Sequence, residues 1–245
     1  PTLKFHQPAV ITITGAAFQP TIDGQRISMW RPIQILAGSI LTIGSAERGM
    51  YGYLFVKGLD IPQILHSTST YEKAGLGKRL QKGDVFNFTP AYTKKVNWSL
   101  KPLIFEKQVT IRVMKGTEYR LFTEASLQQF FSTPYIVTTE ANRMGYRLQG
   151  VPLYQKVQQE LLSAAVTYGT IQVPPNGQPI ILMADRQTTG GYAKIAQVLS
   201  TDLSKLAQCE PGTRVVFKLV SLEEAQECLI QEYNTYQLLK KTIHF

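Results

Sequence analysis

Short apolar segments alternate with turn-forming residues along most of the chain, a pattern typical of a β-barrel or β-sandwich. In the first half, this pattern predicts strands at residues 9–14, 27–30, 39–43 and 51–56. Asp23-Gly24 lies between two apolar runs and predicts a hairpin turn, because both residues tolerate a positive φ. Asp60 and Pro62 predict a short helix over residues 61–66. The first half is therefore expected to be mainly β.

Residues 86–107 are less regular and are interpreted as a connector to a second half. Beyond them, the pattern predicts strands at residues 109–114, 135–139, 169–173, 179–184, 193–199 and 214–220. Helices are expected at residues 124–131, 202–208 and 222–231, the last opened by Ser221 and Glu224 at capping-box spacing. Residues 153–162 have the composition of a helix, but their position between strands favours a strand. Two domains follow, residues 1–105 and 106–245.

The net charge and the distribution of basic residues indicate which classes of partner the chain can bind. The 245 residues carry a formal net charge of +9, and 44% of them are hydrophobic, so the chain can bury a sizeable core. The basic residues are scattered, and the densest groups are Lys78-Arg79 with Lys82, Lys94-Lys95 and Lys240-Lys241. No basic run typical of a nucleic-acid tail is present, so a solvated surface is favoured over a nucleic-acid partner.

The sequence also bears on compartment and metal binding. It contains no secretory signal and no apolar run long enough to cross a bilayer, so no membrane association is expected. Cys209 and Cys228 lack the spacing of a metal or redox pair, which fits a reducing, cytoplasmic location. The histidines His6, His66 and His244 are far apart, and no metal site is predicted.

Residues 185–191 carry the most distinctive chemistry, because seven polar or glycine residues follow an apolar strand. Arg186 can bind a carboxylate or phosphate with two hydrogen bonds, and Asp185 can orient it or accept a proton from an amide nitrogen. Thr188 and Thr189 can donate to a carbonyl or oxyanion. Gly190 and Gly191 allow close backbone approach and positive φ, as in an anion-binding nest.

An alternative is equally compatible with these residue types: a hairpin in which Asp185 and Arg186 form a structural ion pair. A second candidate is the pair Arg143 and Arg147, which an extended segment would place on one face, suited to a carboxylate or phosphate. These arginines are also compatible with ordinary surface cations. The sequence contains no Walker loop, dinucleotide fingerprint, Gly-x-Ser-x-Gly elbow or Met-Lys-Met biotinylation motif.

Residues 169–226 begin GTIQVPPNGQPIILMADRQTTGGY and closely resemble the C-terminal signature of the KipA-like, or allophanate hydrolase subunit 2-like, family. NRMGYRLQG at residues 142–150 is similar to the family's DRMGxRLxG element. In the first half, ITGAAFQPTIDGQRISMWRP and the Ser-Thr-Tyr at residues 69–71 resemble further family elements. The resemblance covers nearly the whole chain.

The resemblance implies two tandem cyclophilin-like β-barrel domains with a few short helices. It also implies the C subunit of a 5-oxoprolinase, which works with two partners, a KipI-like subunit plus a third subunit, to convert 5-oxoproline, a small anionic amide, and ATP to glutamate. In this interpretation the complex binds ATP. Two alternatives within the family are a regulatory protein that binds a KipI-like partner without catalysis, and the carboxyltransferase component of a biotin-dependent enzyme.

Transferred position by position, the resemblance implies a site with three catalytic candidates and a larger set of substrate-binding candidates. The catalytic candidates are Asp185, Arg186 and Lys194. The substrate-binding candidates are Arg143, Gln172, Gln187, Thr188, Thr189, Gly190, Gly191 and Tyr192.

Several positions depart from the family pattern. The family's usual first segment does not precede Pro1, so the first domain is expected to be truncated at its N-terminus. Thr68 replaces an arginine, and residues 75–79 shorten a glycine-rich loop. Residues 163–166 read Ser-Ala-Ala-Val where the family has Ser-Glu-Gly-Val, and Ala193 replaces a proline. The missing first segment and the lost carboxylate both argue against independent catalysis by this chain, and the shortened loop and lost carboxylate favour the regulatory alternative.

Overall fold

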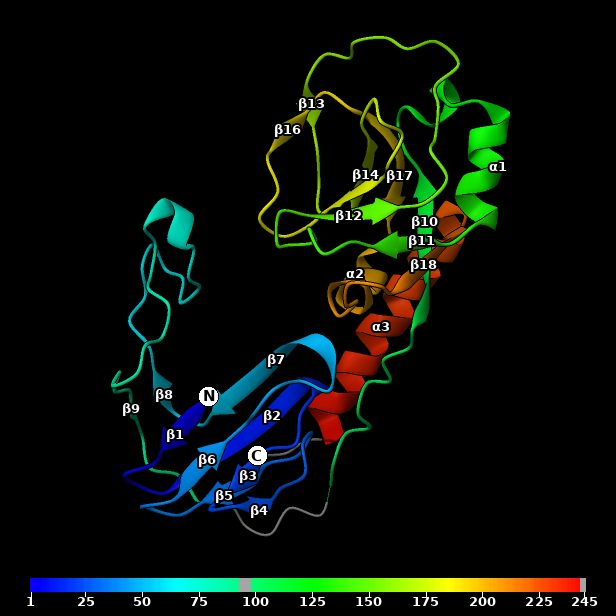
Figure 1. The fold of residues 1–245 in the computed structure, drawn as a ribbon. Helices are drawn as coiled ribbons and strands as arrows, with labels where there is room; N and C mark the ends of the chain where they lie inside the picture. Colours follow the sequence, from blue (N-terminus) through cyan, green and yellow to red (C-terminus); the bar gives the residue numbers. More distant parts are fainter. Residues whose placement is uncertain (93–97, 243–245) are drawn as a thin grey trace. The chain divides into compact units, whose positions relative to one another are not determined.

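The computed structural model describes residues 1–92 and 98–242. The chain divides into two compact units, Pro1–Ile104 and Phe105–Phe245 (Figure 1). The predicted mainly β fold is confirmed, and the described residues form three α-helices and two 3₁₀ turns: α1 (Glu124–Ser132), α2 (Ser200–Ala207), α3 (Leu222–Thr242), η1 (Glu72–Ala74) and η2 (Tyr119–Leu121). The pair Lys94-Lys95, part of the predicted connector, and His244 lie outside the described residues.

Two antiparallel sheets and a short ribbon form the first unit. The three-stranded sheet has the order β5-β2-β7, with bounds Ile33–Ile35, Ala9–Ala17 and Arg48–Val56. The four-stranded sheet has the order β1-β6-β3-β4, with bounds Thr2–Lys4, Ile40–Thr42, Thr21–Ile22 and Gln25–Arg26. The ribbon pairs β8 (Leu59–Asp60) with β9 (Asn87–Phe88). Alternation along β2 places Ile11 and Ile13 in a buried cluster with Phe5, Ile35 and Leu41.

Local turn chemistry explains both the successes and the errors of prediction in this unit. The hairpin at Asp23-Gly24 is confirmed, since both residues have positive φ and join β3 to β4. The strand predicted at residues 27–30 is wrong, because Trp30 has a φ of 62° that breaks the extended chain. The helix predicted at residues 61–66 is also wrong: Leu65 and His66 both have positive φ and form a turn.

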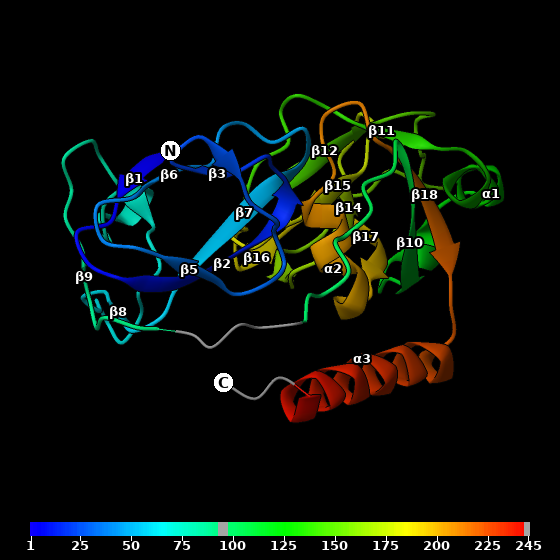
Figure 2. The same ribbon diagram turned by 90° about the horizontal axis from the view of Figure 1, so that it is seen from below.

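Seven strands of the second unit close into a barrel with the order β10-β17-β14-β15-β12-β11-β18 (Figures 1 and 2). Their bounds, in that order, are Gln108–Lys115, Ala193–Val198, Thr170–Val173, Ile180–Leu182, Gly145–Gln149, Tyr135–Val137 and Arg214–Leu219. Parallel pairing of β10 with β18 closes the barrel, while the other neighbours are antiparallel. Each of these strands matches a predicted one, apart from β12, which contains Arg147.

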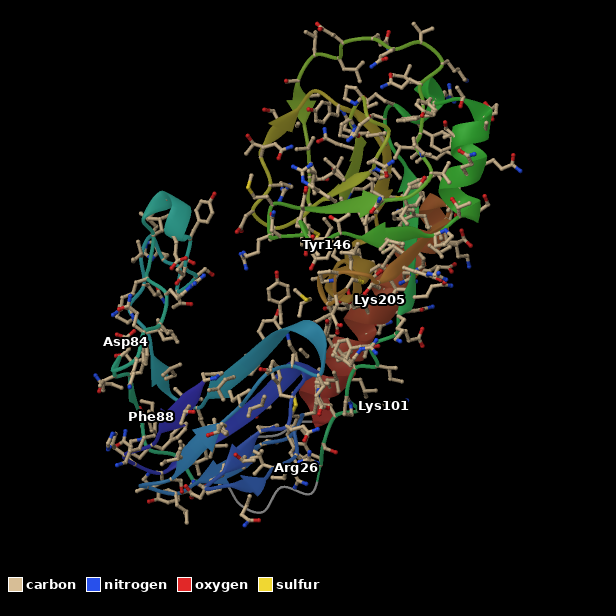
Figure 3. The ribbon with its side chains drawn as sticks, viewed as in Figure 1. Arg26, Asp84, Phe88, Lys101, Tyr146 and Lys205 are labelled. Carbon is tan, nitrogen blue, oxygen red and sulfur yellow. The ribbon has the colours of Figure 1, made fainter. Side chains whose placement is uncertain are left out.

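Large aromatic side chains fill the barrel end next to α1. Phe130 of α1 stacks on Phe217 of β18 with ring centroids 4.4 Å apart, and Tyr135 lies beside both rings. Tyr146 lies on β12 (Figure 3) and is buried. Its hydroxyl donates to the carbonyl of Ala207 at 2.9 Å. The strands and α1 therefore enclose a packed hydrophobic core.

The predicted strand at residues 153–162 is wrong. This segment is irregular, and its only ladder contact in the described chain is a bridge between Gln155 and Phe122. Its backbone pairs with the turn before α1: Lys156 donates to Leu121, and Thr123 donates to Tyr154. These bonds satisfy the backbone locally, so the segment does not join the sheet.

The C-terminal helix begins as predicted and ends later. The backbone N–H of Ser221 donates to Glu224 at 2.7 Å, and the N–H of Glu224 donates to the Ser221 hydroxyl at 3.2 Å, so the capping box is confirmed. Helix α3 then continues to Thr242, eleven residues past the predicted end at Gln231.

Candidate functional site

Residues 185–192, here called the polar loop, connect β15 to β17 across the outside of the barrel. Within this loop, β16 (Thr189–Gly190) pairs with β13 (Ala164–Ala165), and the N–H of Val166 donates to the carbonyl of Thr188 at 3.0 Å. These bonds fix the backbone of the loop. The side chains of Gln187, Thr188, Thr189 and Tyr192 are nevertheless exposed. The loop thus presents polar groups to solvent on a defined backbone.

A bidentate ion pair lies at the start of the polar loop. Arg143 Nε and Nη2 donate to the two carboxylate oxygens of Asp185 at 2.8 and 2.9 Å. The backbone N–H of Asp185 also donates to the Arg143 carbonyl at 2.8 Å, so backbone and side chain hold the two residues together. Asp185 is therefore bound by an arginine that is distant in sequence, and Arg143 is brought into the predicted site.

The neighbouring Arg186 and Arg147 have different surroundings. Arg186 is partly buried, and its Nε atom is enclosed without a hydrogen-bond partner among the described residues. Arg147 lies on β12 and pairs with the exposed carboxylate of Glu140 at 3.1 Å. Arg143 and Arg147, which the sequence suggested as a pair for one ligand, therefore bind different carboxylates in this structure, Asp185 and Glu140.

Gln172 supports the polar loop from beneath. Its side chain is only 1% exposed, its amide nitrogen donates to the Tyr192 carbonyl at 3.3 Å, and its oxygen accepts from Gln187 at 3.4 Å. A Cβ atom on Gly190 would lie 2.5 Å from the Gln172 amide nitrogen. Gly190 is therefore required for close approach between the loop and this amide.

The predicted positive φ at the two glycines is wrong. Neither Gly190 nor Gly191 has a φ in the left-handed region. Pairing of β16 with β13 extends the backbone there, and a Cβ on Gly191 would lie 3.2 Å from the Leu161 carbonyl. Because Gly190 and Gly191 have no side chain, the loop backbone can lie close to its neighbours. Because neither residue has a positive φ, the loop does not form the expected anion-binding nest.

The wall of the barrel beneath the polar loop is itself polar. Ile171 points into the core, whereas Thr170 and Gln172, on either side of it in β14, point outward and are buried under the covering loops. Their register partners on β17 are Gln197 and Lys194, respectively. The Thr170 hydroxyl donates to Gln197 at 2.9 Å. This outward polar face depends on strand register and was not predicted from the sequence.

Glu118 is a further charged residue that the sequence analysis missed. One of its carboxylate oxygens accepts from the Lys194 amine at 3.0 Å and from the Lys194 backbone N–H at 3.0 Å. Burial raises the pKa of Glu118, but hydrogen bonds from Thr117 and Lys194 outweigh that effect, and its net pKa is below the ordinary value. Glu118 could have been identified from the sequence, because it follows a predicted strand closely, as Asp185 does.

Metal-binding and membrane-spanning features are absent from the described parts of the chain. Within residues 1–92 and 98–242, no group of three or more His, Cys, Asp or Glu side chains could hold a metal ion. No α-helix in the same ranges combines the length and apolar character needed to cross a bilayer.

Comparison with known proteins places this fold and loop in a family. Residues 1–219 match the family model described as carboxyltransferase domain, subdomain A and B. The chain belongs to this carboxyltransferase-domain family. The match includes both units up to the end of β18 and the whole polar loop, whereas α3 lies beyond it.

Two members of the family are similar over most of this chain. The 5-oxoprolinase C subunit of Haemophilus influenzae is 39% identical over 91% of this chain and 74% of its own length. The 5-oxoprolinase C subunit of Escherichia coli is 35% identical over 99% of this chain and 80% of its own length. Among solved structures, the Kluyveromyces lactis urea amidolyase is 26% identical with a TM-score of 0.83, covering 92% of this chain and 15% of that one.

The geometry defines what this carboxyltransferase-domain site can do chemically. Arg143 keeps Asp185 in a fixed orientation suited to accepting a hydrogen bond. Thr188 and Thr189 add exposed neutral hydroxyls, and Lys194 adds a cation at the base of the loop. This combination can donate and accept hydrogen bonds to a small polar ligand.

Proposed function

We propose that this chain is the C subunit of an ATP-dependent 5-oxoprolinase complex, which opens the lactam of 5-oxoproline to give glutamate. The observation that carries the proposal is its 39% identity, over 91% of the chain, to a protein named as the C subunit of 5-oxoprolinase. In this proposal the chain is cytoplasmic, and it is active only with its two partners, a KipI-like subunit plus a third subunit.

The polar loop is the proposed binding site for 5-oxoproline. The carboxylate of 5-oxoproline binds the accessible part of the guanidinium of Arg186, a residue that is only partly buried. Asp185, oriented by Arg143, accepts the hydrogen bond of the lactam N–H. The hydroxyls of Thr188 and Thr189 donate to the lactam carbonyl. Each group on the substrate thus meets a protein group of complementary charge or hydrogen-bonding type.

Other residues of the proposed site act from its base and its rim. Lys194, paired with Glu118, provides a fixed positive charge next to the carbonyl, where negative charge develops. Gln172 keeps Tyr192 and Gln187 in place from beneath, and Gly190 and Gly191 let the backbone pass close to the barrel. We therefore propose Gln172 as a positioning residue rather than one that touches substrate, because its side chain is only 1% exposed.

The reaction breaks the lactam C–N bond. An oxygen from water ends on the former carbonyl carbon, and the nitrogen leaves with an added proton as the amine of glutamate. In this proposal, hydrolysis of ATP to ADP and phosphate by the complex would supply the driving force. The polar loop leads into strand β17 and not into a helix, so it does not offer a triphosphate the N–H groups of a helix N-terminus. We accordingly assign ATP to the assembled complex and to no residue of this chain.

Carboxyl transfer is the second candidate. It is favoured by the family model and by the similarity to urea amidolyase. It requires a separate biotinylated protein, because this chain has no biotinyl-lysine motif. A purely regulatory role, in which the chain binds a KipI-like partner without turnover, would require neither 5-oxoproline nor a biotinylated protein.

Reconstitution distinguishes these three functions. The purified chain is combined with its two partner subunits, and ADP and glutamate are measured with 5-oxoproline as substrate. The proposal predicts glutamate formation only when all three proteins and ATP are present. Turnover that needs a biotinylated protein would support carboxyl transfer instead. Tight association with the KipI-like partner but no ADP or glutamate would support regulation and contradict the proposal.

A further inference from the structure

Residues 61–86, here called the arm, leave the first unit after β8 and return to it at β9 (Figure 1). At the base of the arm, Leu59 of β8 pairs with Phe88 of β9. Phe88 also packs against Phe5 of the buried cluster, and its carbonyl accepts from the side chain of Gln7 at 2.7 Å. The base of the arm is therefore fixed to the core of its own unit.

Internal hydrogen bonds give the arm a defined backbone. Tyr71 and Leu76, on either side of η1, bond to each other through both backbone N–H groups, at 2.7 and 3.1 Å. Nearer β9, the carboxylate of Asp84 accepts from the Lys78 amine at 2.7 Å and from the backbone N–H of Gln81 at 2.8 Å (Figure 3 labels Asp84). The arm is thus held by polar contacts along its length.

The arm has no hydrophobic core. None of its described side chains is buried, and six large apolar ones are exposed: Ile61, Ile64, Leu65, Tyr71, Leu80 and Val85. The exposed fractions of Leu65 and Val85 are 81 and 83%. A single exposed apolar side chain is ordinary on a protein surface, but six in one short segment with none buried are a feature of interaction sites. The arm therefore offers apolar contacts that its own unit does not use.

The charge of the first unit indicates which kind of surface fits the arm. The first unit contains 12 basic and 5 acidic residues, whereas the second contains 14 and 12. Within the arm, the carboxylates of Glu72 and Asp84 are paired with Arg79 and Lys78, and Lys82 adds another exposed cation. A partner of the arm therefore needs negative charge as well as apolar groups.

This combination favours a protein partner of acidic character over two other occupants. A second copy of this chain would bring another basic first unit towards the arm, and like charges would repel. The phosphates of a nucleic acid would meet the cations but would leave the leucine and valine side chains without apolar contacts. We propose that the arm is a docking element for an acidic, partly apolar surface of the KipI-like subunit. The identity of this partner rests on the proposed function and is shared by the regulatory alternative.

Calorimetric titration of the full chain with the purified KipI-like subunit tests this proposal. Leu65→Glu and Val85→Glu should each raise the dissociation constant by at least about tenfold, because each replaces an apolar contact with a charge of the partner's sign. Leu36→Glu is the matched control, since Leu36 is 64% exposed in the same unit outside the arm, and it should leave binding unchanged. Circular dichroism checks that all three variants keep the fold. Binding by Leu65→Glu and Val85→Glu equal to that of the wild type, or no binding by the wild type, would overturn the proposal.

Charge reversal tests the acidic character of the partner. Lys82→Glu should weaken binding of the KipI-like subunit, whereas Lys4→Glu, on exposed β1 outside the arm, should not. Duplex DNA of random sequence is the second probe: DNA binding that Lys82→Glu abolishes, with binding of the KipI-like subunit unchanged, would indicate a nucleic-acid partner and overturn the proposal. These titrations contain no 5-oxoproline and no ATP. Binding through the arm without glutamate formation by the complex would therefore contradict the proposed function while supporting this inference.

Discussion

Arg143 binds both carboxylate oxygens of Asp185, although 42 residues separate them in the chain. The barrel makes this possible, because β12 and β15 are paired with Gly145 opposite Leu182, next to the two residues. The polar loop therefore begins with a carboxylate whose direction is set by an adjacent strand, before any substrate is present.

This pair should matter more for activity than for stability. The Arg143 side chain is 60% exposed, so Arg143→Ala is expected to change the free energy of unfolding by less than about 1 kcal/mol in urea denaturation. Arg143→Lys keeps the charge but loses the two-point geometry, and it should lower kcat/KM of the reconstituted complex by about tenfold or more. Activity equal to that of the wild type in Arg143→Lys would show that the orientation of Asp185 is unimportant.

The close approach of Gly190 to Gln172 gives a second prediction. Gly190→Ala should cost about 1–3 kcal/mol of stability, because its methyl group would overlap the buried Gln172 amide. Gln172→Ala removes the amide and should make Gly190→Ala much less harmful in the double variant. A double-mutant cycle from urea denaturation measures this coupling. Strictly additive effects would contradict the contact.

Sequence and structure agree most closely where the signal is local. The Asp23-Gly24 turn and the Ser221–Glu224 capping box each depend on residues within a few positions, and both were predicted correctly. The polar loop was identified for a similar reason, because its polar run follows an apolar strand directly.

Apart from the local turns at Trp30 and at Leu65-His66, the errors arise where distant residues decide the structure. Residues 153–162 have no periodicity that reveals their pairing with the turn before α1. Burial of Gln172 beneath Gly190 and the attachment of Glu118 to Lys194 depend on strand register, which the sequence pattern does not specify. The polar loop could therefore be identified from the sequence, but the contacts of Gln172 and Glu118 that hold it in place could not.

Glu118 provides a third prediction. Glu118→Gln removes the negative partner of Lys194, whose side chain is only 12% exposed. We expect this variant to lower kcat of the reconstituted complex by about tenfold or more while binding of the KipI-like partner is unchanged, because Lys194 loses its fixed position. Glu124→Gln is a suitable control, since that carboxylate is 86% exposed on α1. Loss of KipI-like partner binding in Glu118→Gln would indicate a structural role instead.

The pair of buried Asp202 and half-buried Arg112 gives a prediction for the pH dependence of stability. Burial raises the pKa of Asp202, but hydrogen bonds from Arg112 outweigh it, so the pKa of the folded state lies below the ordinary value. A lowered pKa stabilises the fold at pH values above the unfolded pKa, and this contribution is lost as pH falls through the folded pKa.

Measuring the free energy of unfolding of the wild type and of Asp202→Asn over a range of pH gives that contribution. The wild type should be more stable by about 2 kcal/mol or more at neutral pH, since the variant leaves Arg112 without its charged partner. The difference should shrink as pH falls below about 4. A difference that stays constant down to about pH 2 would contradict the assignment of this pair.

The most direct test of the central claim is glutamate formation by the reconstituted complex with variants of the polar loop. Asp185→Asn and Arg186→Gln should each reduce 5-oxoproline-dependent glutamate formation by at least about a hundredfold, and Arg147→Gln, on the neighbouring strand outside the proposed site, should not. All three variants should still bind the partner subunits. Full activity in Asp185→Asn and Arg186→Gln would contradict the proposal that this loop binds the substrate.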